Sequence, residues 1–370
     1  MDPLTKSLSR RRFLQASAGT AAAAALGGLG TASRVVAQDG PTGVFNWMTW
    51  ADHYYQEQLD EIQGAIGISP SVTELADNAD GFTKLLEVRG QLDMISGDAL
   101  WNPRYHQEGL IEAFDINELE VAQHLYPLAR EFDIWTVPEG YLGFPFGWSP
   151  VQVYYNPKFV DPAPDSWEVF LDPKYQGRCV MENQPVEVTA YMGKFTGAAD
   201  PYNMSDEELA AAKAAMEQLK PNILVLTQQA QETWRLLANE EAWIATANLG
   251  ADEVVKSELN GPDLEVFTPK EGTIGWMDAE MVVAEGANKE LVIPFLERSN
   301  QPEYIAENFI RYGRPLFNES AYKILVDSGH QERADRYLFN KPETVLTMTL
   351  KGPGESTQGA ISVFNEVFGA

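Results

Sequence analysis

Short apolar runs alternate with amphipathic stretches along residues 38–370, a pattern typical of α/β proteins. The clearest helix is predicted to begin after Ser205, because Ser205 and Glu208 have the spacing of a capping box. Leu209, Ala212, Met216 and Leu219 would line its apolar face, and Lys220-Pro221 would end it. We expect buried strands in the apolar runs at residues 44–47, 92–95, 151–155, 179–181, 243–247 and 281–283.

Two stretches rich in proline and glycine, at residues 140–150 and 269–275, flank a central block of the chain. Their placement predicts that the chain leaves one lobe near residue 147 and returns near residue 272, with a possible third connection near residue 320. We therefore predict two discontinuous lobes with a cleft between them. Lobe 1 is expected to contain residues 38–147 and 272–320, and lobe 2 residues 148–271 and 321–370.

The N-terminal segment has the features of an export signal. Ser9-Arg10-Arg11-Arg12-Phe13, followed by an alanine- and glycine-rich run at 16–30, resembles a twin-arginine signal. Small residues at 35–37 suit a signal peptidase, so residues 1–37 are the expected signal peptide of a periplasmic protein. The alternative, a membrane anchor, is opposed by the short, alanine-rich run. We expect no membrane insertion of the mature chain.

Composition narrows the class of partner. The chain has 27 Lys and Arg against 54 Asp and Glu, a net charge of −27, and residues 1–37 hold only one of the acids. This charge argues against nucleic acids and anionic membranes as partners. It fits a cationic ligand, and it fits equally a salt-adapted or very soluble surface. Cys179 is the only cysteine, so no intramolecular disulfide is possible.

The sequence contains no familiar catalytic motif. The four histidines are scattered, and there is neither a G-x-S-x-G elbow nor a phosphate-binding glycine loop. A pair of catalytic acids stays open among so many carboxylates. Adjacent Tyr154 and Tyr155 suggest an iron carrier as an alternative, although neighbours on a strand point to opposite faces. We predict a binding protein without cofactor or metal, and not an enzyme.

Three motifs carry a resemblance to a known family. They are Asn46-Trp47-Met48-Thr49-Trp50, Gly143-Phe144-Pro145-Phe146-Gly147-Trp148, and Pro269-Lys270-Glu271-Gly272 with Ile274-Gly275-Trp276-Met277-Asp278. Together they resemble the spermidine/putrescine-binding proteins of ABC importers, a branch of the extracellular solute-binding family. The resemblance covers nearly all of the mature chain in the order of its elements.

The resemblance implies a fold and a function. The fold would be the two-lobed periplasmic-binding-protein fold, type II-like, in which each lobe is a mixed, mostly parallel sheet flanked by helices. The protein would be a monomer that captures a polyamine-like cation, of the putrescine or spermidine type, in the cleft. Closure of the lobes would trap this amine, which the protein would deliver to the permease subunits of an ABC transporter.

Trp276 and Asp278 suit an ammonium ligand on chemical grounds alone. They are two positions apart, so on an extended strand both point to the same side. Burying an ammonium is costly unless a carboxylate pairs with it, and an aromatic face adds about 0.5 to 2 kcal/mol. The alternative is a core tryptophan beside a surface acid.

The resemblance adds further candidates for ligand binding. Trp47 and Trp50 match aromatic residues that line the family's cleft, and Glu187 matches an acid that pairs with a ligand amine. Gln184 stands where the family usually has an aspartate. Either tryptophan could instead pack within a lobe, and Glu187 could instead stabilise the first turn of a helix.

Several positions depart from the family's pattern. Asp98 and Trp101 lie where a Ser-x-Tyr motif is usual, and the alternative for both is a solvated loop. A tryptophan of the family falls at or near Asn248, and Arg314 replaces a tyrosine before a proline. In the cleft, Arg314 would oppose a diamine and bind a carboxylate. The ligand would then be zwitterionic, such as an amino acid, or an acylated polyamine. The alternative for Arg314 is a surface ion pair, for example with Glu307 or Glu319.

Overall fold

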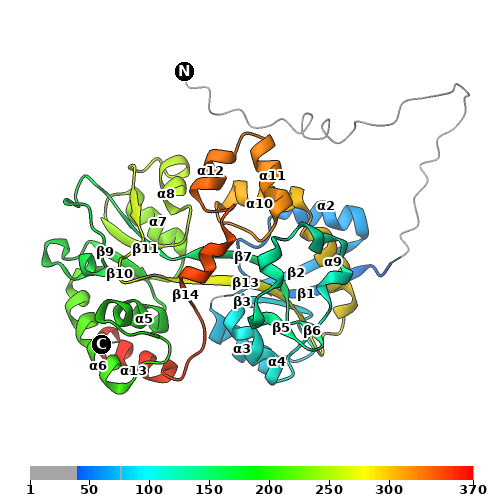
Figure 1. Ribbon diagram of the computed structural model, residues 1–370, viewed down its shortest axis with the longest axis horizontal. Coiled ribbons are helices and arrows are strands. Elements are labelled where there is room, and N and C mark those ends of the chain that lie inside the picture. The colour runs from blue at the N-terminus through cyan, green and yellow to red at the C-terminus, as the bar shows by residue number, and fades with distance from the viewer. Residues whose placement is uncertain (1–39, 76, 370) are drawn as a thin grey trace, which may run out of the picture. The chain divides into compact units, whose positions relative to one another are not determined.

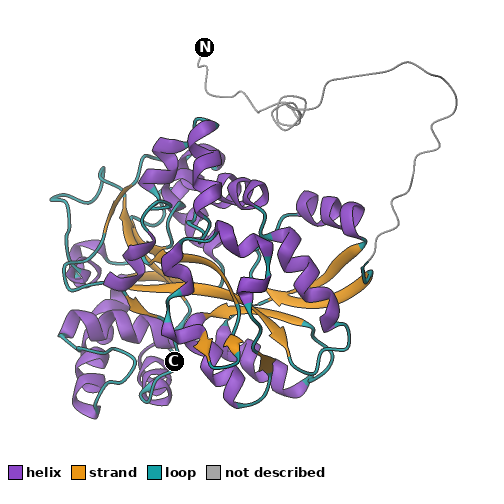
Figure 2. Cartoon of the chain, turned by 45° about the vertical axis from the view of Figure 1, so that its right-hand side comes forward, coloured by secondary structure: helices purple, strands orange, loops and turns teal. Residues whose placement is uncertain are grey.

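The computed structural model describes residues 40–75 and 77–369, in which helices alternate with strands around two mixed sheets (Figures 1 and 2). This arrangement confirms the α/β class. The predicted signal peptide, residues 1–37, lies outside the described residues. In the described part of the chain, no helix is both long enough and apolar enough to cross a membrane.

The first sheet has seven strands in the order β14-β13-β3-β1-β2, with β4 and β7 also paired to β13. The strands are β1 (Gly43–Thr49), β2 (Ile68–Glu74), β3 (Met94–Asp98), β4 (Ile111–Glu112), β7 (Phe144–Pro150), β13 (Ile274–Val283) and β14 (Thr349–Leu350). β1 is parallel to β2 and β3, whereas β13 is antiparallel to β3, β4 and β7. β13 therefore joins strands that come from both ends of the chain.

The helices that share a hydrophobic core with this sheet come from residues 56–107 and 292–336. They are α2 (Gln56–Ile66), α3 (Asn78–Glu87), α4 (Asn102–Gln107), α9 (Val292–Ser299), α10 (Pro302–Tyr312), α11 (Glu319–Asp327) and α12 (Gln331–Arg336). Apolar side chains from these helices and from the sheet strands form one core, the first core, with Phe45, Ile95 and Phe295 among its fully buried members. A small hairpin of β5 (Thr136–Val137) and β6 (Gly140–Tyr141) completes this part.

The second sheet has five strands in the order β10-β9-β11-β8-β12. They are β8 (Gln152–Tyr155), β9 (Cys179–Glu182), β10 (Ile223–Thr227), β11 (Ile244–Ala247) and β12 (Glu265–Phe267). Its helices are α5 (Pro185–Thr196), α6 (Asp206–Leu219), α7 (Ala230–Ala238), α8 (Ala251–Glu253) and α13 (Thr357–Phe368). α6 has the predicted capping box, and Tyr154 and Tyr155 lie in different core clusters, as their alternation on a strand requires.

The end of the chain divides differently from the sequence prediction. Residues 321–350 were expected in lobe 2. However, α11 and α12 bury Ala321, Leu325 and Ala334 in the first core. Only α13 packs with α5 and α6, through Phe364. We therefore propose lobes of residues 40–150 with 275–350, and 151–274 with 351–369. The third connection then lies at residues 351–356 and not near residue 320.

The three connecting segments lie side by side. Val151 N donates to Ile274 O at 2.8 Å, Thr349 N to Thr273 O at 3.1 Å, and Lys351 N to Gly275 O at 2.7 Å. β7 thus leads into β8, β12 into β13, and β14 into the segment before α13 at one place in the molecule (Figure 1). Side chains near these crossings are the ones that can face both sheets.

Candidate functional site

Two carboxyl groups meet where β3 and β13 pair. Asp98, the last residue of β3, lies opposite Asp278 in the register, and both side chains are buried. Burial raises the pKa of Asp98 well above its usual value, and the neighbouring Asp278 raises it further. Burial also raises the pKa of Asp278 to about 7, while the neighbouring carboxyl group of Asp98 and the charge of Arg314 lower it. Burial and Asp278 thus favour the protonated form of Asp98, and Asp278 is the group whose pKa lies near neutrality.

Asp278 uses only one of its two oxygens within the protein. Its Oδ2 lies 2.9 Å from His53 Nε2 and 3.9 Å from Arg314 Nη1. Its Oδ1 is buried and has no hydrogen-bond partner among the described residues. A buried carboxylate oxygen without a donor is costly, so this atom is an acceptor available to a ligand.

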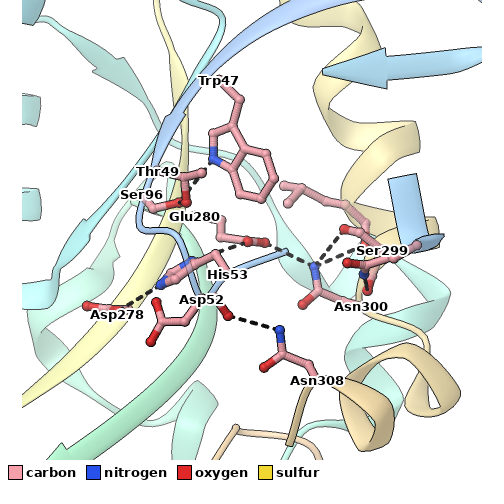
Figure 3. A network of polar contacts seen from close by, with 12 residues as sticks. Trp47, Thr49, Asp52, His53, Ser96, Asp278, Glu280, Ser299, Asn300 and Asn308 are labelled. Carbon is pink, nitrogen blue, oxygen red and sulfur yellow. Dashed lines mark hydrogen bonds and ion pairs between the residues drawn. The ribbon is translucent and has the colours of Figure 1, made fainter. Parts of the chain in front are cut away.

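His53, in the turn after β1, contacts Asp278. Figure 3 shows the imidazole between Asp278 and Glu280, whose Oε1 lies 3.7 Å from Nδ1. The ring stacks on Phe146 with centroids 4.2 Å apart. Burial lowers the pKa of His53, so the ring is neutral near pH 7 and can donate to Asp278 through Nε2. His53 was not identified from the sequence, where it is an isolated histidine without a motif.

Arg314 lies in the site and not at the surface. Its guanidinium is 5.2 Å from the ring centroid of Phe146 and 5.6 Å from that of Trp276, and the side chain is buried. Nη2 donates to the carbonyl oxygen of Asp52 at 2.6 Å, and Nε lies 3.1 Å from Asp52 Oδ2. The predicted surface pairs with Glu307 or Glu319 are therefore not formed. The guanidinium of Arg314 thus binds Asp52 and holds the loop after β1 in place.

Trp276 is oriented by the second sheet. The indole is buried, and its Nε1 donates to Asn248 Oδ1 at 3.0 Å. Asn248 follows β11, and its carbonyl oxygen accepts a hydrogen bond from Tyr154 at 3.1 Å. Trp276 and Asp278 both lie near Arg314, so they share one side of β13, as their spacing predicts.

A small pocket lies on the second sheet, and Asn248, the hydrogen-bond partner of Trp276, is part of its lining. It has room for about one water molecule. The polar side chains that line it are those of Glu182, Gln184, Glu187, Tyr191, Thr246, Asn248 and Lys351. Gln184 precedes the first turn of α5, in which Glu187 lies, so helix α5 positions two of the predicted residues.

Lys351 is the functional candidate that the sequence did not indicate. Its Nζ donates to Gln184 Oε1 at 3.3 Å, and Gln184 Nε2 donates in turn to Glu182 Oε2 at 2.9 Å. Burial opposes the charge of Lys351, but Tyr191 and the acids Glu187, Asp98 and Glu182 raise its pKa, so it is an ammonium. Burial raises the pKa of Glu182 and Glu187, and Lys351 opposes this shift. The residue follows β14 in a short segment without any motif.

Two of the other predicted tryptophans pack in the first core. Trp47 is fully buried in the first core, where it packs against Phe295 and its Nε1 donates to Ser96 Oγ at 3.0 Å. Trp101 packs against Phe82 with centroids 5.9 Å apart. Trp50 is half-buried beside the same core, and its Nε1 has no partner among the described residues. Trp47 therefore follows its packing alternative. Trp101 is buried in the same core and not in a solvated loop, and we omit both from the proposed site.

The bacterial extracellular solute-binding protein family matches residues 72–327. This chain belongs to that family. It is 24% identical over 338 residues to the spermidine/putrescine-binding periplasmic protein of Escherichia coli K12. The aligned region covers 86% of this chain and 88% of the relative. The family consists of solute-binding components of transporters, which confirms the prediction of a binding protein and not an enzyme.

Solved structures agree in fold at low sequence identity. A spermidine/putrescine ABC transporter protein of Listeria monocytogenes superposes with a TM-score of 0.78 at 19% identity, over 88% of this chain and 98% of the other. A lipoprotein of Treponema pallidum gives 0.73 at 18% identity, with the same coverage. These similarities confirm the predicted periplasmic-binding-protein fold.

Proposed function

We propose that this protein captures a small amine-bearing solute between its two lobes and delivers it to the permease subunits of an ABC importer. The observation that carries the proposal is the buried, unpartnered Oδ1 of Asp278. Asp278 and the indole of Trp276 both lie near Arg314. An ammonium group supplies the donor that this oxygen lacks, and the indole face supplies cation–π attraction of about 0.5 to 2 kcal/mol.

The surrounding charges support an amine as ligand. Asp278, Glu182 and Glu187 gather near the crossing segments, and the pKa of each is raised by burial. Carboxylates held in this way gain from a cation that brings donors and positive charge. Trp50, with its free indole N–H beside the first core, is the second aromatic candidate.

Two classes of amine fit this site. A polyamine is supported by the E. coli relative, whose name describes binding of spermidine and putrescine. A zwitterionic or acylated amine is supported by Arg314, a buried cation within 3.9 Å of Asp278. The proposed mechanism is the same for both. The lobes close about the three connecting segments, and the permease recognises the closed form.

Calorimetry on the mature chain, residues 38–370, tests this proposal. The titrants are putrescine, spermidine, cadaverine, amino acids, opine-like conjugates and ferric citrate. We expect saturable binding of at least one amine by one site per chain. Absence of binding by every amine would refute the proposal, as would conversion of the ligand. Binding of ferric citrate alone, lost on chelation, would identify an iron carrier instead.

A further inference from the structure

Lys351 enters the site from the third connection, at a point fixed by the backbone. Its N–H donates to the carbonyl oxygen of Gly275, the residue before Trp276. The side chain then reaches the pocket on the second sheet that contains Glu182 and Glu187. Because the backbone is tied to β13, this ammonium is a permanent part of the site.

The charge of Lys351 is less satisfied than that of Arg314. Among residues 40–75 and 77–369, its Nζ has a single hydrogen bond, to the neutral amide of Gln184, and no carboxylate within 4.0 Å. An ammonium has three donors, so two are left for a ligand. Arg314, in contrast, is bound to the carbonyl and the carboxylate of Asp52.

The pocket that contains Glu182 and Glu187 therefore already contains a cation, the ammonium of Lys351. A diamine with one ammonium at Asp278 would bring its second ammonium toward Lys351, and like charges at close range oppose binding. A ligand with a hydrogen-bond acceptor at that end would instead receive the free donors of Lys351.

We propose that Lys351 is a built-in ammonium that selects ligands with one ammonium, at Asp278, and a carboxylate or amide oxygen at the other end. Monoamines such as ω-amino acids and N-acylated diamines are then the substrate class, and unmodified diamines are disfavoured. This inference rests on the proposed function, since it assumes that the amine lies at Asp278.

Matched ligands test the role of Lys351. Diamines, ω-amino acids and N-acetyl diamines of equal carbon number, from three to six, are titrated into the wild type, Lys351→Met and the surface control Lys323→Met. The Lys323 side chain is exposed on α11 and pairs only with Glu319 among the described residues. We expect the wild type to bind acceptor-bearing monoamines about tenfold more tightly than the matched diamine. In Lys351→Met we expect the matched diamine to bind about tenfold more tightly than the acceptor-bearing monoamine. Lys323→Met should keep the wild-type preference.

Each outcome has a defined meaning. A wild type that prefers diamines overturns the inference and leaves the proposed function intact. A preference for acceptor-bearing ligands that survives Lys351→Met also overturns it, because another group would then select the ligand. Failure of the folded wild type to bind any amine overturns the proposed function as well. If Lys351→Met does not fold, Lys351→Gln replaces it, and the wild-type preference still tests the inference.

Discussion

Replacement of Asp278 by asparagine removes the negative charge and one of the two acceptor oxygens on which the proposed amine site depends. The carboxylate Oδ2 already contacts His53, and Oδ1 is free for the ligand. A hydrogen bond to a charged group contributes about 1.5 to 3 kcal/mol, so Asp278→Asn should weaken amine binding by about 10- to 150-fold above pH 7. The loss should be an affinity effect, because asparagine has nearly the same size as aspartate.

The raised pKa of Asp278 makes this loss depend on pH. Because that pKa is about 7, the carboxyl is mostly protonated at pH 6, and an ammonium favours the ionised form. Binding therefore releases a proton, and wild-type affinity should rise by about tenfold per pH unit below pH 7 and level off above it. Wild type and Asp278→Asn should accordingly converge as the pH falls.

Isothermal titration calorimetry between pH 5.5 and 8.5 measures both effects. Repeating the titrations in two buffers of different ionisation enthalpy gives the number of protons released. The control is Asp263→Asn, an exposed carboxylate that pairs with Lys256, and it should follow the wild-type curve. Equal affinity of Asp278→Asn and wild type at pH 8, or an unchanged pH slope in the variant, would refute the assigned role.

Three further predictions separate binding from packing. Trp276→Leu should weaken amine binding by about 0.5 to 2 kcal/mol in the same titrations, and unchanged affinity would remove the indole from the site. Trp47→Ala should lower the free energy of unfolding in urea by about 3 to 5 kcal/mol because it empties a core position, while amine affinity stays at the wild-type value. Burial raises the pKa of Cys179 to about 12, so Ellman's reagent should not label this thiol at pH 8 until urea unfolds the protein. Rapid labelling of the native chain would contradict the burial of Cys179.

Local patterns in the sequence were sufficient for the elements. All six apolar runs predicted as strands fall on strands of the structure, and Ser205 caps α6 through the predicted box with Glu208. The shared side of Trp276 and Asp278 follows from their spacing of two on a strand. Such features depend on residues within one or two turns or on alternation along one strand, and neighbouring positions encode them directly.

Tertiary structure decided which of these residues share an environment. Arg314 binds Asp52, which lies 262 positions away, and His53 contacts Asp278 across 225 positions. Trp47 is a core residue because Phe295 packs against it, and α11 and α12 join the first core through a face that fits either lobe equally well on pattern alone.

Lys351 is the clearest example of a residue whose place in the site only the tertiary structure decides. Its surrounding sequence carries no signal of function, and its ammonium enters the site only because β14 pairs with β13 and its own N–H binds Gly275. The sequence by itself determined the elements and the family, and it predicted the candidate acids Asp98, Glu187 and Asp278 and the indole of Trp276. Which charges meet, and hence which ligand the site can accept, depends on contacts between distant segments, for which periodicity and spacing provide no information.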